Sequence, residues 1–174
     1  HRAISRYRIL SDSVTRWHNE RAEPALKAFR QEADALPHYQ TTRSYLTPSR
    51  EAVTLSTEDG YRVRAARRMI EDAREGAEPS DYLDAQRELV ALADKREAEL
   101  VEIRARHGVD RINAMDSRYG DALVDAKESI INHEPRSMAD LAAKSAFICE
   151  VDLWGDEDAG EAIARDIAAL ARRA

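Results

Sequence analysis

Apolar residues recur at intervals of three and four along most of the chain, which is the spacing of one face of an α-helix. The clearest series lies between residues 110 and 130 and consists of Ile112, Met115, Tyr119, Ala122, Ala126 and Ile130. A second series lies between residues 80 and 107 and consists of Leu83, Leu89, Leu92, Leu100 and Ile103. Only His107 and Gly108 separate the two stretches, as in paired helices joined by a short turn. The pattern predicts an all-α fold with a long antiparallel helical hairpin over residues 80–133, packed with flanking helices.

Polar residues at defined places mark the ends of these helices. Ser80 and Ser137 each precede an apolar series, so we expect both to act as helix N-caps. Arg96 interrupts the first series at a seam position, where polar residues set register in coiled coils. A last helix is predicted after the acidic stretch 152–161, ending near Arg172.

The N-terminal residues 4–36 show the same periodicity, with one interruption. Pro24 lacks a backbone donor and clashes with the preceding turn. Either the helix kinks at this proline or a second helix starts with Pro24 in its first turn. Leu36-Pro37 ends the segment.

Residues 37–56 have no sustained period and are predicted to be an irregular loop. After it, either a short hairpin near Asp59-Gly60 or a helix capped by Ser56, with Asp59 completing the cap, fits the sequence. We favour the helix, ending near Gly76. The predicted organisation is an N-terminal part of helices and loop (1–56) and a helical hairpin bundle (57–174), folding together as one domain.

The composition fits this helical prediction. Of 174 residues, 43% are hydrophobic and 34% charged, with 30 alanines but only six glycines. Such a chain is not collagenous, not a disulfide scaffold and not a multi-span membrane protein. The single cysteine, Cys149, lies in an apolar stretch and is predicted to be a buried hydrophobe. With no apolar run of ~18 residues and no signal peptide, a cytoplasmic location without membrane contact is expected.

Charge is distributed unevenly and includes one basic cluster. Residues 1–76 carry 14 basic and 11 acidic side chains, whereas residues 77–174 carry 13 and 22. The cluster consists of Arg62, Arg64, Arg67, Arg68 and Arg74. One interpretation is that these arginines contact phosphates or a partner. The other, which we favour, is that they form a solvated face and pair with nearby acids.

No pattern in the sequence indicates catalysis. The five histidines lack metal-ligand spacing, and the acidic stretch 152–161 does not match a calcium loop. A glycine-rich phosphate loop and a nucleophile elbow are also absent from the sequence. We therefore predict no catalytic residue, no cofactor-binding residue and no metal site.

Several segments resemble small all-helical bacterial proteins of unassigned function. They are residues 59–67, 103–110, 135–144 and 165–170. The similarity lies in the part of the chain beyond residue 57. It implies a helical hairpin organisation and no activity, so no residue role is carried over.

Together these patterns favour a non-enzymatic helical interaction or assembly protein that forms a homodimer or binds another protein. The alternative is a nucleic-acid-associated regulator that uses the Arg62–Arg74 basic face. An enzyme with a metal site built between subunits is the least favoured of the three.

Overall fold

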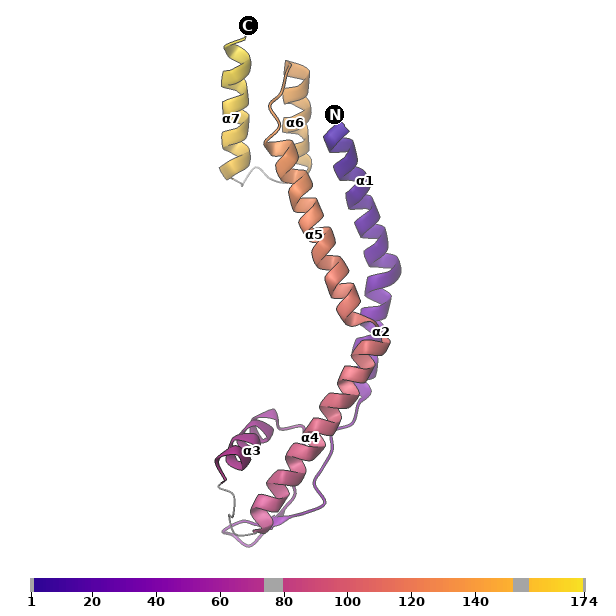
Figure 1. Cartoon of the computed structure of the whole chain (residues 1–174), viewed down its shortest axis with the longest axis vertical. Helices are drawn as coiled ribbons and strands as arrows, with labels where there is room; N and C mark the ends of the chain where they lie inside the picture. The colour runs from indigo at the N-terminus through magenta and orange to yellow at the C-terminus, as the bar shows by residue number, and fades with distance from the viewer. Residues whose placement is uncertain (1, 74–79, 152–156, 174) are drawn as a thin grey trace. The chain divides into compact units, whose positions relative to one another are not determined.

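The computed structural model describes residues 2–73, 80–151 and 157–173. Its elements in chain order are α1 (Arg2–Trp17), the π-helical turn η1 (His18–Ala22), α2 (Glu23–Ala35), β1 (Tyr45–Leu46), β2 (Ala52–Val53), α3 (Gly60–Asp72), α4 (Asp81–Arg106), α5 (Val109–Ile131), α6 (Met138–Glu150) and α7 (Glu157–Ala171). The predicted all-α class is confirmed, because every described element longer than two residues is helical (Figure 1). Within the described part of the chain, no helix has both the length and the apolar character needed to cross a bilayer.

The chain forms two compact units, each of which is described by itself. Unit 1 comprises residues 1–24 and 111–174, and unit 2 comprises residues 25–110. The predicted boundary between residues 56 and 57 lies inside unit 2. The compact units do not test which parts of the chain fold together, so the predicted division into residues 1–56 and 57–174 within one domain stays a prediction.

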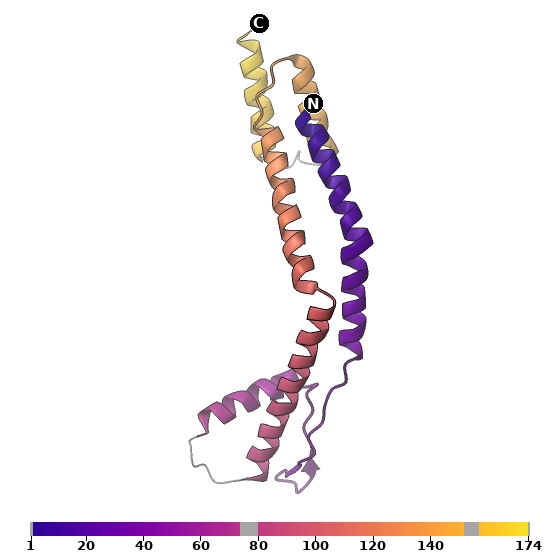
Figure 2. The same ribbon diagram turned by 45° about the vertical axis from the view of Figure 1, so that its right-hand side comes forward.

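The core of unit 1 lies where α6 and α7 meet the first residues of α1 and the last residues of α5. The ring of Tyr7 on α1 meets that of Phe147 on α6 edge to face, with centroids 5.0 Å apart. Further along, α1 runs beside α5 in both views (Figure 2), and Trp17 contacts Tyr119 at a centroid distance of 5.0 Å. The buried core residues are Ile130, Ile131, Phe147, Ile148, Ala159 and Ala162. The apolar series predicted on α5 therefore faces α1 within this unit.

The two long helices predicted on either side of a glycine turn are confirmed. The turn consists of His107 and Gly108, and Gly108 has a φ of 63°, the left-handed conformation that glycine adopts at helix ends. Ser80 caps α4 by accepting a hydrogen bond from the Leu83 amide at 3.2 Å. Since α4 belongs to unit 2 and nearly all of α5 to unit 1, the antiparallel pairing of their two series stays a prediction.

Unit 2 is built on the packing of α3 against α4. Its buried residues are Leu55, Ala66, Ala85 and Leu89. The predicted helix after the loop is confirmed, but its cap is Asp59 instead of Ser56. The Asp59 carboxylate accepts hydrogen bonds from the Tyr61 and Arg62 amides, whereas the Ser56 hydroxyl accepts one from the Glu58 amide within the preceding turn. The observed cap lies three residues after the predicted one, a shift that the apolar periodicity of the helix does not determine.

The segment 37–56, predicted to be irregular, contains a small ordered hairpin. Tyr45 pairs with Val53 and Leu46 with Ala52 in an antiparallel register. Strands of two residues contain too few positions to show an alternating apolar pattern in the sequence. Their stability depends on contacts made elsewhere in the unit.

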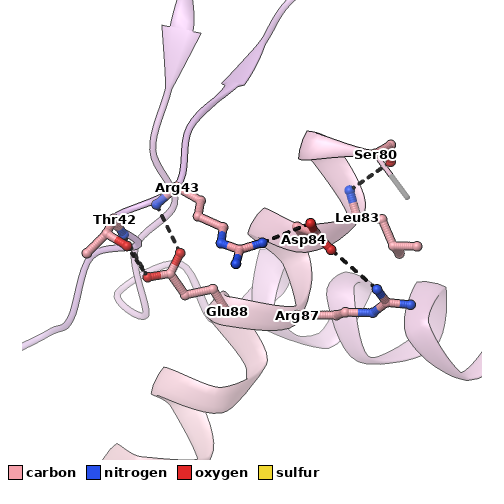
Figure 3. Close-up of polar contacts among 7 residues, drawn as sticks. All are labelled: Thr42, Arg43, Ser80, Leu83, Asp84, Arg87 and Glu88. Atoms are coloured by element: carbon pink, nitrogen blue, oxygen red, sulfur yellow. Dashed lines mark hydrogen bonds and ion pairs between the residues drawn. The ribbon is translucent and has the colours of Figure 1, made fainter. Parts of the chain in front are cut away.

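Carboxylates on α4 hold the loop that precedes this hairpin (Figure 3). Glu88 accepts hydrogen bonds from the Thr42 amide at 2.8 Å, the Thr42 hydroxyl at 2.7 Å and the Arg43 amide at 2.9 Å. Arg43 also forms an ion pair with Asp84, with 2.8 Å between Nη1 and Oδ2. The backbone hydrogen bond from Thr42, followed by the other donors, lowers the pKa of Glu88. The loop is therefore attached to α4 mainly by polar contacts.

Pro24 is accommodated by one widened helical turn. The Glu23 amide donates to the carbonyl of His18, five residues earlier, so the turn before the proline is π-helical. Pro24 is the second residue of α2. Trp17 and Glu23, which flank this turn, both have right-handed helical backbone angles, so the helical backbone continues up to the proline without a break.

The prediction that Cys149 is buried is wrong. Phe147 and Ile148 are buried in the core of unit 1, whereas Cys149 is exposed. Each residue of a helix is rotated by about 100° from the one before it, so an apolar run longer than two residues reaches the outer face. The predicted helix end at Gly76 and the acidic stretch 152–156 lie outside the described residues.

Candidate functional site

The predicted basic cluster lies on α3. Of its five arginines, four are described, and Arg74 lies outside the described residues. The helix buries Ala66 against α4, and positions two residues before and after it point to the opposite side, since a helix turns by about 100° per residue. The cluster therefore divides between the two sides of the helix.

Two of the arginines are held by acidic side chains. Arg67 reaches α4, where its Nη2 lies 2.7 Å from Asp94 Oδ1 and 3.1 Å from Glu97 Oε2. Arg62 lies 3.4 Å from a carboxylate oxygen of Asp59, the residue that caps the helix. Ion pairs therefore hold these two guanidinium groups within unit 2.

The other two arginines form the outer side of α3. Arg64 and Arg68 are exposed and have no hydrogen bond or ion pair with another described residue. Tyr61 lies on the same side and is 76% exposed. With Met69 and Asp72, these side chains line an open depression of about 570 Å³. We call Tyr61, Arg64 and Arg68 the basic face of α3.

The outer side of α5 has the opposite charge. Opposite the apolar series of α5 lie three exposed carboxylates, Asp121, Asp125 and Glu128, and none of them contacts another described residue through a hydrogen bond or ion pair. Val124 lies among them and is 53% exposed. We call Asp121, Val124, Asp125 and Glu128 the acidic face of α5. These acids were not predicted from the sequence, because they lie outside the apolar series that indicates the helix.

A groove between α3 and α4 contains Arg96, the polar residue that interrupts the apolar series of α4. The groove has a volume of about 480 Å³ and is lined on the α4 side by Ala93, Arg96, Glu97 and Leu100. The Nε atom of Arg96 is buried and has no hydrogen-bond partner among the described residues. We call this depression the α3–α4 groove.

Unit 1 has an apolar groove of about 410 Å³ between α6 and α7. Met138, which is 69% exposed, and Ile167 both line it. Arg173 lies at the groove and forms an ion pair with Glu134, with 2.5 Å between Nη2 and Oε1. We call this depression the α6–α7 groove.

One buried ion pair joins α6 to α7 and was missed by the sequence analysis. The Nζ of Lys144 lies 2.5 Å from Asp166 Oδ2 and 3.1 Å from the carbonyl oxygen of His133. A signal for it does exist, since Asp166 continues the spacing of the buried Ala159 and Ala162 at intervals of three and four. A carboxylate on an apolar series requires a partner of opposite charge.

The described histidines do not lie in groups of potential metal ligands. Among the residues that the structure describes, no three His, Cys, Asp or Glu side chains are grouped so that they could hold a metal ion. His107 ends α4, and its Nε2 lies 2.7 Å from Glu32 Oε2, while Arg106 forms an ion pair with the same carboxylate. The hydrogen bond to His107 is the main cause that lowers the pKa of Glu32.

Comparisons with known proteins add no family to these observations. No protein-family model matches the chain, and neither the curated proteins nor the solved structures contain a significant match. The helical organisation implied by the resemblance is confirmed by the fold itself.

Proposed function

We propose that the protein is a non-enzymatic helical assembly protein that forms a homodimer, in which the basic face of α3 in one copy contacts the acidic face of α5 in another. The observation that carries this proposal is the presence of two outward helix faces of opposite charge, both without partners among the described residues. Complementary charged surfaces steer encounter and select the orientation of a complex.

The side chains on both faces are of the kinds found in interfaces. Tyrosine and arginine are enriched at the centres of protein–protein contacts, because each combines an apolar surface with hydrogen-bonding groups. On α3, Tyr61 stands beside Arg64 and Arg68, and on α5, Val124 provides an apolar surface among the carboxylates. Each face therefore offers apolar area together with charge.

The spacing of the charges favours an antiparallel contact. Arg64 and Arg68 are four residues apart, as are Asp121 and Asp125, so each pair spans about 6 Å along its helix. An antiparallel arrangement places Arg64 near Asp125 and Arg68 near Asp121. It also brings Asp72 of α3 toward Arg118 of α5, whereas a parallel arrangement brings Asp72 toward the acidic Glu128.

The first experiment is sedimentation velocity of the wild-type chain over a range of concentrations up to tens of micromolar. We expect a monomer–dimer equilibrium that weakens as the salt concentration rises, since exposed charges are screened. A chain that stays monomeric over this range would contradict self-association.

Charge reversal then tests the two faces. The double variant Arg64→Glu/Arg68→Glu and the double variant Asp121→Arg/Asp125→Arg should each weaken the homodimer by about tenfold or more. An equimolar mixture of the two should form a heterodimer, because both contacts then join opposite charges. Arg2→Glu/Arg6→Glu is the matched control, since these exposed arginines on α1 are also four residues apart and unpaired among the described residues.

The α6–α7 groove offers a competing contact surface, and a single variant tests it. If Met138→Glu abolishes the dimer while both charge reversals leave it intact, the contact lies at the α6–α7 groove, and the assignment to α3 and α5 is wrong. Circular dichroism of each variant shows whether its helix content is unchanged.

A second candidate function is nucleic-acid binding through the basic face of α3. The guanidinium groups of Arg64 and Arg68 favour it, because they have no partner among the described residues and phosphate oxygens accept hydrogen bonds from arginine. Electrophoretic mobility shifts with duplex DNA and with RNA should then weaken steeply as salt increases. The ion pairs of Arg62 and Arg67 leave few positive charges for this role, so self-association is preferred.

A further inference from the structure

The α3–α4 groove has the size and position of a small-molecule site. Its volume of about 480 Å³ lies within the range of roughly 300–1,000 Å³ that ligand pockets occupy. Both helices belong to unit 2 and pack directly against each other. On the α3 side the groove is lined by Val63, Arg64 and Arg67, and by Thr57, which lies three residues before the helix begins.

Arg96 contributes a hydrogen-bond donor that the described residues leave unsatisfied. Its Nε is buried in the groove wall and has no acceptor among them. A buried donor on a charged group is costly when it stays unpaired. The guanidinium group presents Nε and Nη donors side by side, an arrangement that matches two oxygens of one anionic group.

Two more donors line the same groove. Arg64 has no partner among the described residues. The buried hydroxyl of Thr57 accepts a hydrogen bond from the Tyr39 amide at 2.8 Å, and no described acceptor takes its proton. A hydroxyl both donates and accepts, so this proton is available to a ligand.

The acidic side chain in the groove is already engaged. Glu97 accepts a hydrogen bond from Arg67, whose guanidinium also binds Asp94. Three positive side chains therefore line the groove against the single carboxylate of Glu97. The remaining surface comes from the apolar side chains of Val63, Ala93 and Leu100.

We propose that the α3–α4 groove binds a phosphate monoester with a small apolar body, whose phosphate is held by Arg96, Arg64 and Thr57. Donors from three separate elements suit the three terminal oxygens of a tetrahedral phosphate better than the two coplanar oxygens of a carboxylate. The apolar body lies along Val63, Ala93 and Leu100. The site shares Arg64 with the basic face of α3, whereas Arg96 belongs to the groove and not to that face, so the variant Arg96→Met tests the groove separately from self-association.

Phenyl phosphate is a suitable probe, with benzoate and inorganic phosphate as comparison ligands. Titration of the full chain followed by ³¹P and protein NMR should show saturable binding of phenyl phosphate with a dissociation constant of about 1 mM or lower. Benzoate and inorganic phosphate should bind more weakly. No saturable binding of phenyl phosphate, or equally tight binding of benzoate, would overturn the proposal.

Substitution of the unsatisfied arginine tests the position of the site. Arg96→Met keeps the aliphatic length and should weaken phenyl phosphate binding by about tenfold or more, since hydrogen bonds to a charged group are lost. Arg87→Met is the control, because Arg87 also lies on α4 but pairs with Asp84 outside the groove. Unchanged affinity in Arg96→Met, or an equal loss in Arg87→Met, would show that the phosphate is not bound in this groove. Arg64→Gln gives a second measure of the same site should Arg96→Met alter the helix content.

Discussion

The buried ion pair of Lys144 and Asp166 should be one of the most sensitive positions of unit 1. Their side chains are 5% and 1% exposed, and Nζ lies 2.5 Å from Oδ2. Removing one partner of such a pair leaves the other charge buried, at a cost of about 3–5 kcal/mol. The structure indicates which change costs more.

After Asp166→Ala, the ammonium of Lys144 still donates to the carbonyl oxygen of His133 at 3.1 Å, so we expect a loss near 3 kcal/mol. After Lys144→Met, the carboxylate of Asp166 loses its hydrogen-bond donor, and its other oxygen, Oδ1, has none among the described residues. The exposed Arg165 lies 4.0 Å from that oxygen and compensates only partly. We therefore expect Lys144→Met to cost about 5 kcal/mol.

The double variant Lys144→Met/Asp166→Leu should recover most of this loss, because apolar side chains of similar size replace both charges. Urea unfolding followed by tryptophan fluorescence is the assay, since Trp17 contacts Tyr119 within unit 1. A loss below about 1 kcal/mol in both single variants, or a double variant as unstable as the worse single one, would refute the reasoning.

Three further changes have defined expected outcomes. Gly108→Ala should lower the free energy of unfolding in urea by about 1 kcal/mol, because Gly108 has a positive φ. Gly120→Ala inside α5 should raise it by a similar amount, since alanine favours the helix and has space there. Equal effects of the two variants would refute the role assigned to the positive φ. Ser137→Ala should cost about 1 kcal/mol through loss of the α6 cap, and Ser137→Asp should restore it. The pKa of Glu88 is lowered by folding, so its stabilising effect is complete above its unfolded pKa near 4.5 and is lost as the pH falls through the lower folded value. Hydrogen exchange at the Thr42 amide should therefore show reduced protection in Glu88→Ala at neutral pH, and protection unchanged by this variant would contradict the role of the carboxylate.

Local signals in the sequence predicted the helices and most of their ends. The apolar spacing from Ile112 to Ile130 corresponds to the series that is half-buried or buried in α5. Ser80 and Ser137 act as caps because a hydroxyl next to the first helical turn reaches an unpaired amide without help from distant residues. The cap predicted at Ser56 lies three residues before the observed cap, Asp59, so the predicted start of α3 differs from the observed one by less than one helical turn.

The candidate sites were predicted less completely. The sequence placed the arginines of the basic cluster on one face of one helix, whereas in the structure Arg67 reaches α4 and Arg64 and Arg68 lie on the outer side. It did not show that Arg67 reaches Asp94 and Glu97, because these acids come from a different helix. The hairpin around Tyr45 and Val53 and its attachment to Glu88 were missed for the same reason.

The sequence by itself therefore determined the helical class and the helix boundaries within a few residues. These properties depend on backbone geometry and on residues within one or two turns, which the linear pattern contains. The tertiary structure alone decided which charges are paired, as with Lys144 and Asp166, and which remain without a partner among the described residues, as with Arg64. Pairing depends on distances between residues far apart in the chain, and only the packing of the helices sets those distances.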